Sequence, residues 1–403
     1  MRLYLELPTW AAWLHRPLDI LALPILYLVI LPFTAAYHTL LSLRYGVPHG
    51  WELRHYLYLN LRRVGSQYGS YRRLPPVDPE EDVLPARAEM YLPKCEYARV
   101  SCQALSKDVP RLGVLQTARA VVRDKDVTGF MIRRRGLGTS EDLLAPAEDG
   151  ERIIYFIVGG GYIGGHPLRI HTAWSLAELT GARVFCINYR KSLSASSAFP
   201  GSLIDCLAGY QYLVRTLGVS PSNITLNGDS AGANACMALA RYLSELEGCG
   251  WPDFGMVGGM VLHSPWSDMS SSFASIRTNR YTDHLPSLTL TAIPSHTRHF
   301  PSRANPYFSP ALTPAGGWAF LVKHGVRVYV SAGSAEGMYD EIVALQSGMK
   351  RDGVDVELRV IQGGTHSEFV WVDRGEIDTM GFSWPVIRED FATFWAGSAS
   401  ASA

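Results

Sequence analysis

Residues 224–232 read ITLNGDSAG, and a helical pattern of apolar side chains follows over residues 233–246. The opening ITLN is a strand-like run, and the glycines at 228 and 232 permit a tight turn into the helix. A strand, a Gly-x-Ser-x-Gly turn and a helix in this order raise a serine hydroxyl above the edge of a sheet. Ser230 is therefore the candidate nucleophile; the alternative is a glycine-rich turn with a solvent-facing serine.

Strand-length apolar runs alternate with helical segments from about residue 115 onward. This alternation predicts an α/β fold in which a mostly parallel sheet is flanked by helices on both faces. The predicted strands are 153–158, 183–188, 223–227, 256–263, 326–332 and 356–361, preceded by two strands of an antiparallel edge at 118–122 and 129–133. The predicted helices include 168–180, 202–217, 233–246 and 341–351.

The 403-residue chain carries 37 basic and 37 acidic residues, which gives a formal net charge of zero. This balance offers no electrostatic basis for binding nucleic acid. The six cysteines are irregularly spaced without a Cys-x-x-Cys pair, so the sequence predicts no metal site and no cofactor. Cys95 and Cys102 could pair in an oxidising compartment or stay reduced, and the sequence leaves both states open.

An uncharged apolar stretch runs from Ile20 to Leu43, between Arg16 and Arg44. It is long enough to cross a hydrocarbon core of about 30 Å, and its two prolines are tolerated in membrane helices. We expect an uncleaved single-pass anchor in the membrane of the endoplasmic reticulum. A cleaved signal peptide or a buried core helix are the alternatives. The arginines at 44, 54, 62 and 63 after the span favour a cytosolic catalytic domain, although orientation stays open.

The sequence therefore divides into four parts. Residues 1–45 form the anchor, and residues 46–110 are expected to be a linker with cap-forming helices. Residues 111–396 form the catalytic domain, which contains a cap insert at about 267–312. The Ser/Ala-rich tail, residues 397–403, is expected to be disordered.

A serine nucleophile needs a general base and a carboxylate that orients the base. His366 follows the predicted strand 356–361, where such a base is expected. Glu336 follows the preceding strand and is the favoured acid; Asp340, four residues on, is the alternative. Asp340 could instead begin the following helix, where a carboxylate suits the positive end of the helix dipole.

Acyl transfer also needs hydrogen-bond donors for the developing oxyanion. A glycine loop follows the predicted strand 153–158, and bare glycine backbone can approach a ligand closely. The N–H groups of Gly160, Gly161 and Ala231 are the candidate oxyanion hole. A phosphate-binding loop is the weaker interpretation, because no Walker Lys-Ser/Thr follows and the glycines do not fit GxGxxG.

These motifs together resemble the hormone-sensitive-lipase-like (GDXG) branch of the α/β-hydrolase fold, a family of carboxylic ester hydrolases. The resemblance covers residues 153–394 and rests on GGGY at 159–162, NYR at 188–190, Phe199-Pro200 with Asp205, GDSAG at 228–232, SPW at 264–266, residues 333–340 and His366. It implies a triad of Ser230, Glu336 and His366, the oxyanion hole named above, and a cap built from N-terminal helices and the insert. The anchor makes the chain similar to membrane-bound fungal sterol-deacetylase-like members.

The sequence departs from the family at two positions. The family has a histidine before its three glycines, where this chain has Val158, so the hole is expected to be looser or differently supported. The family acid is commonly aspartate, where this chain has Glu336.

The resulting functional hypothesis is an esterase or deacetylase that acts on a small hydrophobic ester through an acyl-enzyme. Two alternatives stay open. One is a tailoring enzyme of secondary metabolism that catalyses a non-hydrolytic cyclisation or elimination, and the other is a receptor that binds a small molecule without turnover.

Overall fold

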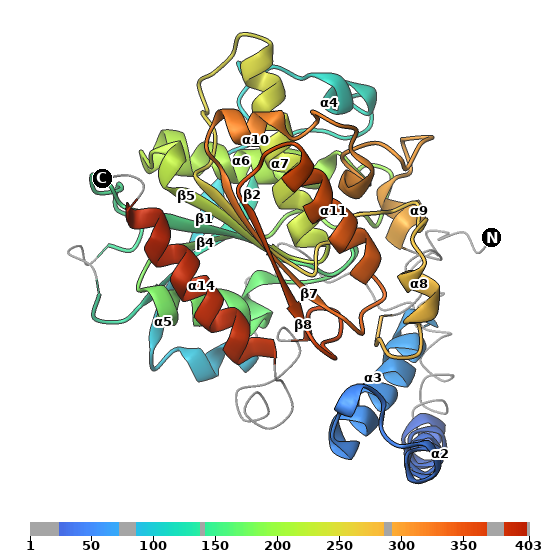
Figure 1. The fold of residues 1–403 in the computed structure, drawn as a ribbon. Coiled ribbons are helices and arrows are strands. Elements are labelled where there is room, and N and C mark those ends of the chain that lie inside the picture. The colour runs from blue at the N-terminus through green and yellow to red at the C-terminus, as the bar shows by residue number, and fades with distance from the viewer. Residues whose placement is uncertain (1–23, 72–85, 138–141, 286–291, 369–382, 401–403) are drawn as a thin grey trace, which may run out of the picture. The chain divides into compact units, whose positions relative to one another are not determined.

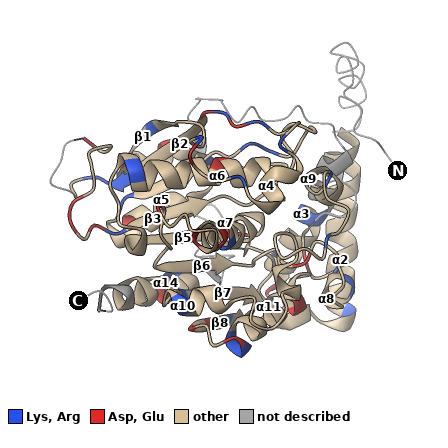
Figure 2. Cartoon of the chain, turned by 90° about the horizontal axis from the view of Figure 1, so that it is seen from above, with Lys and Arg blue, Asp and Glu red and all other residues tan. Residues whose placement is uncertain are grey.

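The computed structural model describes residues 24–71, 86–137, 142–285, 292–368 and 383–400. The chain divides into two compact units, Met1–Arg73 and Leu74–Ala403, and each is described by itself. Along the described elements, Lys and Arg positions alternate with Asp and Glu positions and are not gathered by sign (Figure 2).

The first unit contains one long apolar helix. A π-helical turn, η1 (Leu26–Ile30), continues into α2 (Leu31–Tyr45), which makes 20 helical residues, and the most apolar 18-residue stretch of this helix has a mean hydropathy of 1.6. The wide turn directly precedes Pro32, which lacks an N–H donor and crowds the preceding turn. By length and composition this helix could cross a membrane or serve as a signal sequence. Residues 20–23 of the predicted span lie outside the described residues.

The helix α3 (Leu53–Tyr71) packs against α2, and the short 3₁₀ turn η2 (Pro48–Gly50) connects them. The His38 ring is hydrogen-bonded to the Tyr56 hydroxyl at 2.7 Å, which joins the two helices.

The second unit is built on an eight-stranded sheet in the order β1-β2-β4-β3-β5-β6-β7-β8 (Figure 1). β2 runs antiparallel to β1 and β4, and all other neighbours are parallel. The predicted mostly parallel sheet is therefore confirmed. The strands are β1 Cys95–Cys102, β2 Val127–Arg134, β3 Ile153–Ile157, β4 Val184–Ile187, β5 Ile224–Asp229, β6 Gly259–His263, β7 Arg327–Gly333 and β8 Val356–Ile361.

The prediction of a strand at 118–122 is wrong. Residues 118–122 form a turn after α4 (Gly113–Thr117), where the N–H groups of Val121 and Val122 both donate to the Ala118 carbonyl. Ala118 and Val122 are buried, but Ala120 between them is exposed, whereas the alternation of a strand would bury all three on one face.

The edge strand is instead β1, inside the segment that was expected to hold only a linker and helices. The sheet domain therefore begins by Cys95 and not at residue 111. An extended strand of eight residues separates Cys95 from Cys102 by roughly 23 Å, so no disulfide joins them, and both thiols are reduced and buried.

Helices cover both faces of the sheet (Figure 1). α5 contacts α14 on one face, and α6 contacts α7 on the other. α11 packs against β7 and β8 through buried apolar side chains, and the shorter helices and 3₁₀ turns lie in the connections between strands. The helices are α5 His171–Thr180, α6 Gly201–Gln211 with its π turn η5 Tyr212–Thr216, α7 Ala231–Gly248, α8 Ser275–Thr278, α9 Ala292–His296, α10 Ala319–Lys323, α11 Tyr339–Arg351 and α14 Ser383–Ser400, and the 3₁₀ turns are η3 Ala86–Tyr91, η4 Pro167–Arg169, η6 Pro221–Asn223 and η8 Pro310–Leu312.

The chain end differs from the predicted disordered tail. α14 continues through residues 397–400, and residues 401–403 lie outside the described residues. The helix is anchored by the buried side chains of Ile387, Phe391 and Phe394. Alanine and serine extend an anchored helix at little energetic cost.

A buried ion pair ties the loop after β4 to α6. The Arg190 Nε lies 3.0 and 2.9 Å from the two carboxylate oxygens of Asp205, and the Arg190 backbone N–H donates to the same carboxylate at 2.7 Å. Both side chains are almost inaccessible to solvent. Removing one partner of such a pair leaves an uncompensated buried charge.

We expect Asp205→Asn to lower the free energy of unfolding by about 3 kcal/mol, because it strands the Arg190 guanidinium in the protein interior. Asp108 pairs with Arg215 on the surface and provides the matched control, since Asp108→Asn should change that free energy by at most about 1 kcal/mol. Urea unfolding of both variants measures the difference. Equal destabilisation by the two substitutions would contradict this account.

Candidate active site

Ser230 lies between β5 and α7, as the sequence predicts, with φ of 53° and ψ of −120°. This backbone conformation is strained for a residue with a side chain. Glycines permit the close packing that holds it, because a Cβ on Gly232 would lie 1.9 Å from the Ile157 carbonyl oxygen and one on Gly228 2.6 Å from the Gly232 carbonyl carbon. The Ser230 N–H donates to the His263 carbonyl at 2.9 Å, so β6 also restrains the turn.

The three predicted triad residues lie in one hydrogen-bonded chain. His366 Nε2 lies 2.8 Å from Ser230 Oγ, and His366 Nδ1 lies 2.8 Å from Glu336 Oε2. A carboxylate can only accept, so Nδ1 carries the proton that is donated to Glu336. Nε2 is then free to accept the proton of the serine hydroxyl, which is the arrangement that activates a serine.

Glu336 faces the histidine, and the alternative acid Asp340 does not. The second oxygen of Glu336 accepts the Gly333 N–H at 2.8 Å and the Ser264 hydroxyl at 3.3 Å. The Asp340 carboxylate instead accepts the Ser275 N–H at 2.8 Å, near the start of α11. The sequence left these two carboxylates open because they lie only four positions apart; the turn after β7 separates them.

Burial and the charge of the partner shift the pKa values of Glu336 and His366 in opposite directions. Burial raises the pKa of Glu336, and the hydrogen bond from His366 partly offsets that rise. Burial alone would lower the pKa of His366, but the hydrogen bond and charge of Glu336, together with the charges of Asp283 and Asp229, raise it above its ordinary value. The site therefore stabilises the imidazolium that forms when Ser230 loses its proton.

The glycine loop after β3 lies beside the turn that carries Ser230. The Gly159 N–H donates to the Asp229 carboxylate at 3.1 Å, and burial raises the pKa of Asp229 to about 6. Gly160 and Gly161 have φ of 113° and 63°, and Ala231 is the first residue of α7. Across the described part of the chain, no protein acceptor receives the N–H groups of Gly160, Gly161 or Ala231. These amides can therefore donate to a ligand oxygen.

Tyrosines support this loop where the resembled family has a histidine. The Tyr189 hydroxyl donates to the Val158 carbonyl at 2.8 Å, and Val158 itself is buried. The Tyr162 hydroxyl donates to the Asn234 side chain at 2.7 Å, which attaches the loop to α7. His296 of the insert stacks on the Tyr162 ring with centroids 3.7 Å apart. The loop is thus differently supported, as expected from Val158.

Sequence reasoning missed Tyr162, Asn234 and Asp283 as parts of the site. Tyr162 lies inside the glycine motif 159–162, and Asn234 lies two residues after the serine motif 228–232, so their positions in the sequence could have indicated them. Asp283 gave none, because it lies in the irregular part of the insert. His263, the last residue of β6, is buried and hydrogen-bonded to the Ser331 hydroxyl at 2.9 Å.

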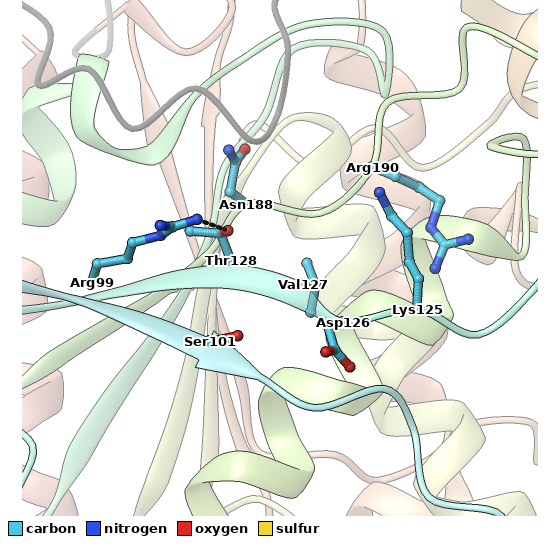
Figure 3. Close-up of a pocket in the computed structure, with 8 residues that line it drawn as sticks. All are labelled: Arg99, Ser101, Lys125, Asp126, Val127, Thr128, Asn188 and Arg190. Carbon is cyan, nitrogen blue, oxygen red and sulfur yellow. Dashed lines mark hydrogen bonds between the residues drawn. The ribbon is translucent and has the colours of Figure 1, made fainter.

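A polar pocket occurs elsewhere, at the edge of the sheet near β1 and β2 (Figure 3). None of the predicted triad or oxyanion residues lines it. Its lining residues are Arg99, Ser101, Lys125, Asp126, Val127, Thr128, Asn188 and Arg190. Within the described ranges, no group of three His, Cys, Asp or Glu side chains is arranged to hold a metal ion.

Two curated proteins with hydrolase names are similar to this chain. An acetyl-hydrolase of Streptomyces hygroscopicus is 32% identical over 136 residues, which cover 34% of this chain and 42% of that protein. An ethyl acetate hydrolase of Pseudomonas putida is 27% identical over 227 residues, which cover 55% of this chain and 67% of that protein. The chain thus spans less than half the length of the first relative and about two thirds of the second.

A solved structure of a hormone-sensitive lipase from a metagenome library has a TM-score of 0.58 and 21% identity, and covers 85% of this chain and 97% of that one. This likeness concerns the fold. The family model described as alpha/beta hydrolase fold matches residues 154–370, more than half of the chain. This match includes the serine turn, both candidate acids and the histidine, and the chain belongs to the alpha/beta hydrolase fold family.

Proposed function

We propose that the protein is a carboxylic ester hydrolase that acts on a lipophilic ester through Ser230, His366 and Glu336. The observation that carries the proposal is the hydrogen-bonded chain from Ser230 Oγ through both ring nitrogens of His366 to Glu336. The strained backbone of Ser230 and the amides available at Gly160 and Gly161 support it.

In the proposed mechanism, Ser230 Oγ attacks the ester carbonyl carbon while its proton moves to His366 Nε2. The oxyanion of the tetrahedral intermediate accepts hydrogen bonds from the N–H groups of Gly160, Gly161 and Ala231. The intermediate collapses, His366 gives its proton to the alcohol that leaves, and an acyl-serine remains. Water, activated by His366, then attacks the acyl-serine, and the carboxylic acid is released.

We infer that the acyl group is short, so that the enzyme is a deacetylase. The names of the acetyl-hydrolase and the ethyl acetate hydrolase support a two-carbon acyl group. The apolar helix of residues 26–45 supports a lipophilic alcohol, because a membrane-bound enzyme meets esters that partition into the bilayer.

We expect Ser230→Ala to lower kcat/KM by on the order of 10⁴-fold or more, because no other group can form the acyl intermediate. A panel of esters with acyl chains from acetyl to long chain, including an acetylated sterol, measures this on the full-length protein. Wild type should prefer the acetyl esters. Undiminished turnover by Ser230→Ala would contradict the mechanism, and a long-chain optimum would contradict the deacetylase assignment alone.

We expect Glu336→Gln to lower kcat by on the order of 10³–10⁴-fold, because the amide no longer stabilises the imidazolium. Asp340→Asn is the matched control, since it neutralises a carboxylate in the first turn of α11, four residues from Glu336, that does not face His366. It should retain most of the activity while still accepting the Ser275 N–H. Steady-state kinetics with an acetyl ester compare the two variants, and a greater loss in Asp340→Asn would reverse the assignment of the acid.

We further propose that residues 26–45 are an uncleaved single-pass anchor in the membrane of the endoplasmic reticulum. A 20-residue helix spans about 30 Å, which suits a bilayer of that thickness or slightly thinner. Its exposed side chains include Leu28, Phe33 and Leu43.

We expect the full-length protein to stay in the membrane pellet after carbonate extraction and to retain its N-terminal residues by mass spectrometry. Replacing Phe33 and Ala36, near the middle of the helix, with arginine should release the protein, because an arginine at the centre of a membrane helix opposes insertion by about 2.5–3.5 kcal/mol. A mature N-terminus beyond residue 45 would instead identify the helix as a signal sequence.

A further inference from the structure

A short segment of the insert binds the backbone of the loop that carries Glu336. We call residues 275–283 the clasp; it begins with α8, which packs against α11 (Figure 1). We call residues 334–337, which include Glu336, the acid loop. Clasp side chains donate to its four consecutive carbonyl groups. These bonds are Asn279 Nδ2 to Ser334 O at 3.3 Å and to Glu336 O at 3.0 Å, Thr282 Oγ1 to Ala335 O at 2.9 Å, and Ser275 Oγ to Gly337 O at 2.8 Å.

Asp283, the last residue of the clasp, links the acid loop to the loop that carries the base. Its Oδ2 accepts the Gly337 N–H at 2.8 Å, and its Oδ1 accepts the His366 N–H at 3.3 Å. The Oδ1 atom also accepts the His284 N–H at 2.8 Å. Asp283 is buried. One carboxylate from the insert therefore contacts the backbone next to Glu336 and that of His366 itself.

The charge of Asp283 also acts on the His366 ring. Asp283 is among the carboxylates that raise the pKa of His366, after Glu336 and before Asp229. Burial raises the pKa of Asp283, while the charge of His366 and the three amide donors oppose that rise. Burial raises the pKa of the nearby Glu368 to about 8, so this group is mainly neutral at pH 7. The titratable groups around the Asp283–His366 pair are Glu336, Asp229, Glu368 and His284, whose ring centroid lies 6.4 Å from that of His366.

We propose that Asp283 is a positioning residue for ester hydrolysis: it holds the Glu336 and His366 loops together and adds a negative charge that favours the imidazolium. The proposal rests on the function proposed above for Ser230, His366 and Glu336. The insert is then part of the catalytic apparatus, because clasp side chains donate to four carbonyl groups of the acid loop and Asp283 accepts the His366 N–H.

Three variants of the full-length protein separate geometry from charge. Asp283→Asn removes the charge and one of the two acceptor oxygens. Thr282→Val keeps the volume and the charge but removes the donor to the Ala335 carbonyl. Asp355→Asn is the matched control, because it neutralises an exposed carboxylate just before β8, at the opposite end of the strand from His366.

Two readouts are measured on each variant. The first is the pH profile of kcat/KM for an acetyl ester. The second is the NMR titration of the His366 ring in ¹³C-histidine-labelled protein, assigned with His366→Gln, which does not depend on turnover. Thermal unfolding verifies that each variant is folded.

We expect Asp283→Asn to lower the plateau of kcat/KM by about 10- to 100-fold, because the acid and base loops lose their common anchor. Loss of the negative charge lowers the pKa of His366, whose neutral form is the active base. The acidic limb of the pH profile of kcat/KM and the NMR titration of the His366 ring should therefore both move to lower pH by at least about 0.5 unit. Thr282→Val should lower the plateau by about three- to tenfold without moving either titration. Asp355→Asn should change neither.

A folded Asp283→Asn protein with an unmoved His366 titration would overturn the role of the charge, and one with an unchanged plateau would overturn the positioning role. If Asp283→Asn does not fold, Asp283→Glu keeps the charge at a shifted position. The Asp283→Glu variant should then lose activity without a change in the NMR titration of His366. Full activity in both Asp283→Glu and Thr282→Val would overturn the proposal. A wild-type protein that hydrolyses no ester defeats the proposed function, whereas the NMR titration still decides the effect of Asp283 on His366.

Discussion

The strained turn at Ser230 is the constraint on which the rest of the site depends. A side chain with φ of 53° and ψ of −120° is held only where the surrounding structure leaves no relaxed alternative. The neighbouring glycines let the turn lie against the end of β3, and the N–H and carbonyl of Ser230 bond to residues of the β6 end. The central strands therefore fix the serine, and the other groups are arranged around it.

Around this fixed serine, buried carboxylates do most of the organising. Glu336 orients the ring of His366, Asp229 accepts the amide at the start of the glycine loop, and Glu341 accepts two amides from the segment that follows β6. Each carboxylate is desolvated, which would be costly without the hydrogen bonds it accepts. The bonds offset that cost and fix loops that contain no regular secondary structure. The negative charges of Glu336, Asp283 and Asp229 also favour a protonated His366, which is the species that the proposed reaction must stabilise.

The glycine loop illustrates how one departure from a family pattern can be accommodated. With Val158 in place of a histidine, the Tyr189 hydroxyl holds the start of the loop from outside, and the hydroxyl of Tyr162, at the end of the loop, attaches it to Asn234 of α7. Because Tyr162 also stacks on His296, the insert contacts the loop as well as the acid. The insert thus contacts both the glycine loop, which provides the proposed oxyanion hole, and the loop that carries Glu336.

The sequence by itself determined the α/β alternation, the serine turn and the order of serine, acid and histidine, because these depend on local periodicity and on glycines at fixed spacing. It could not identify β1, because an edge strand with mixed polarity lacks a clear alternation, and it took the apolar turn at 118–122 for a strand. Tertiary structure alone decided that Glu336 rather than Asp340 faces His366, and that Asp283 joins their loops. These choices depend on hydrogen bonds between segments up to 83 residues apart, which no local pattern records.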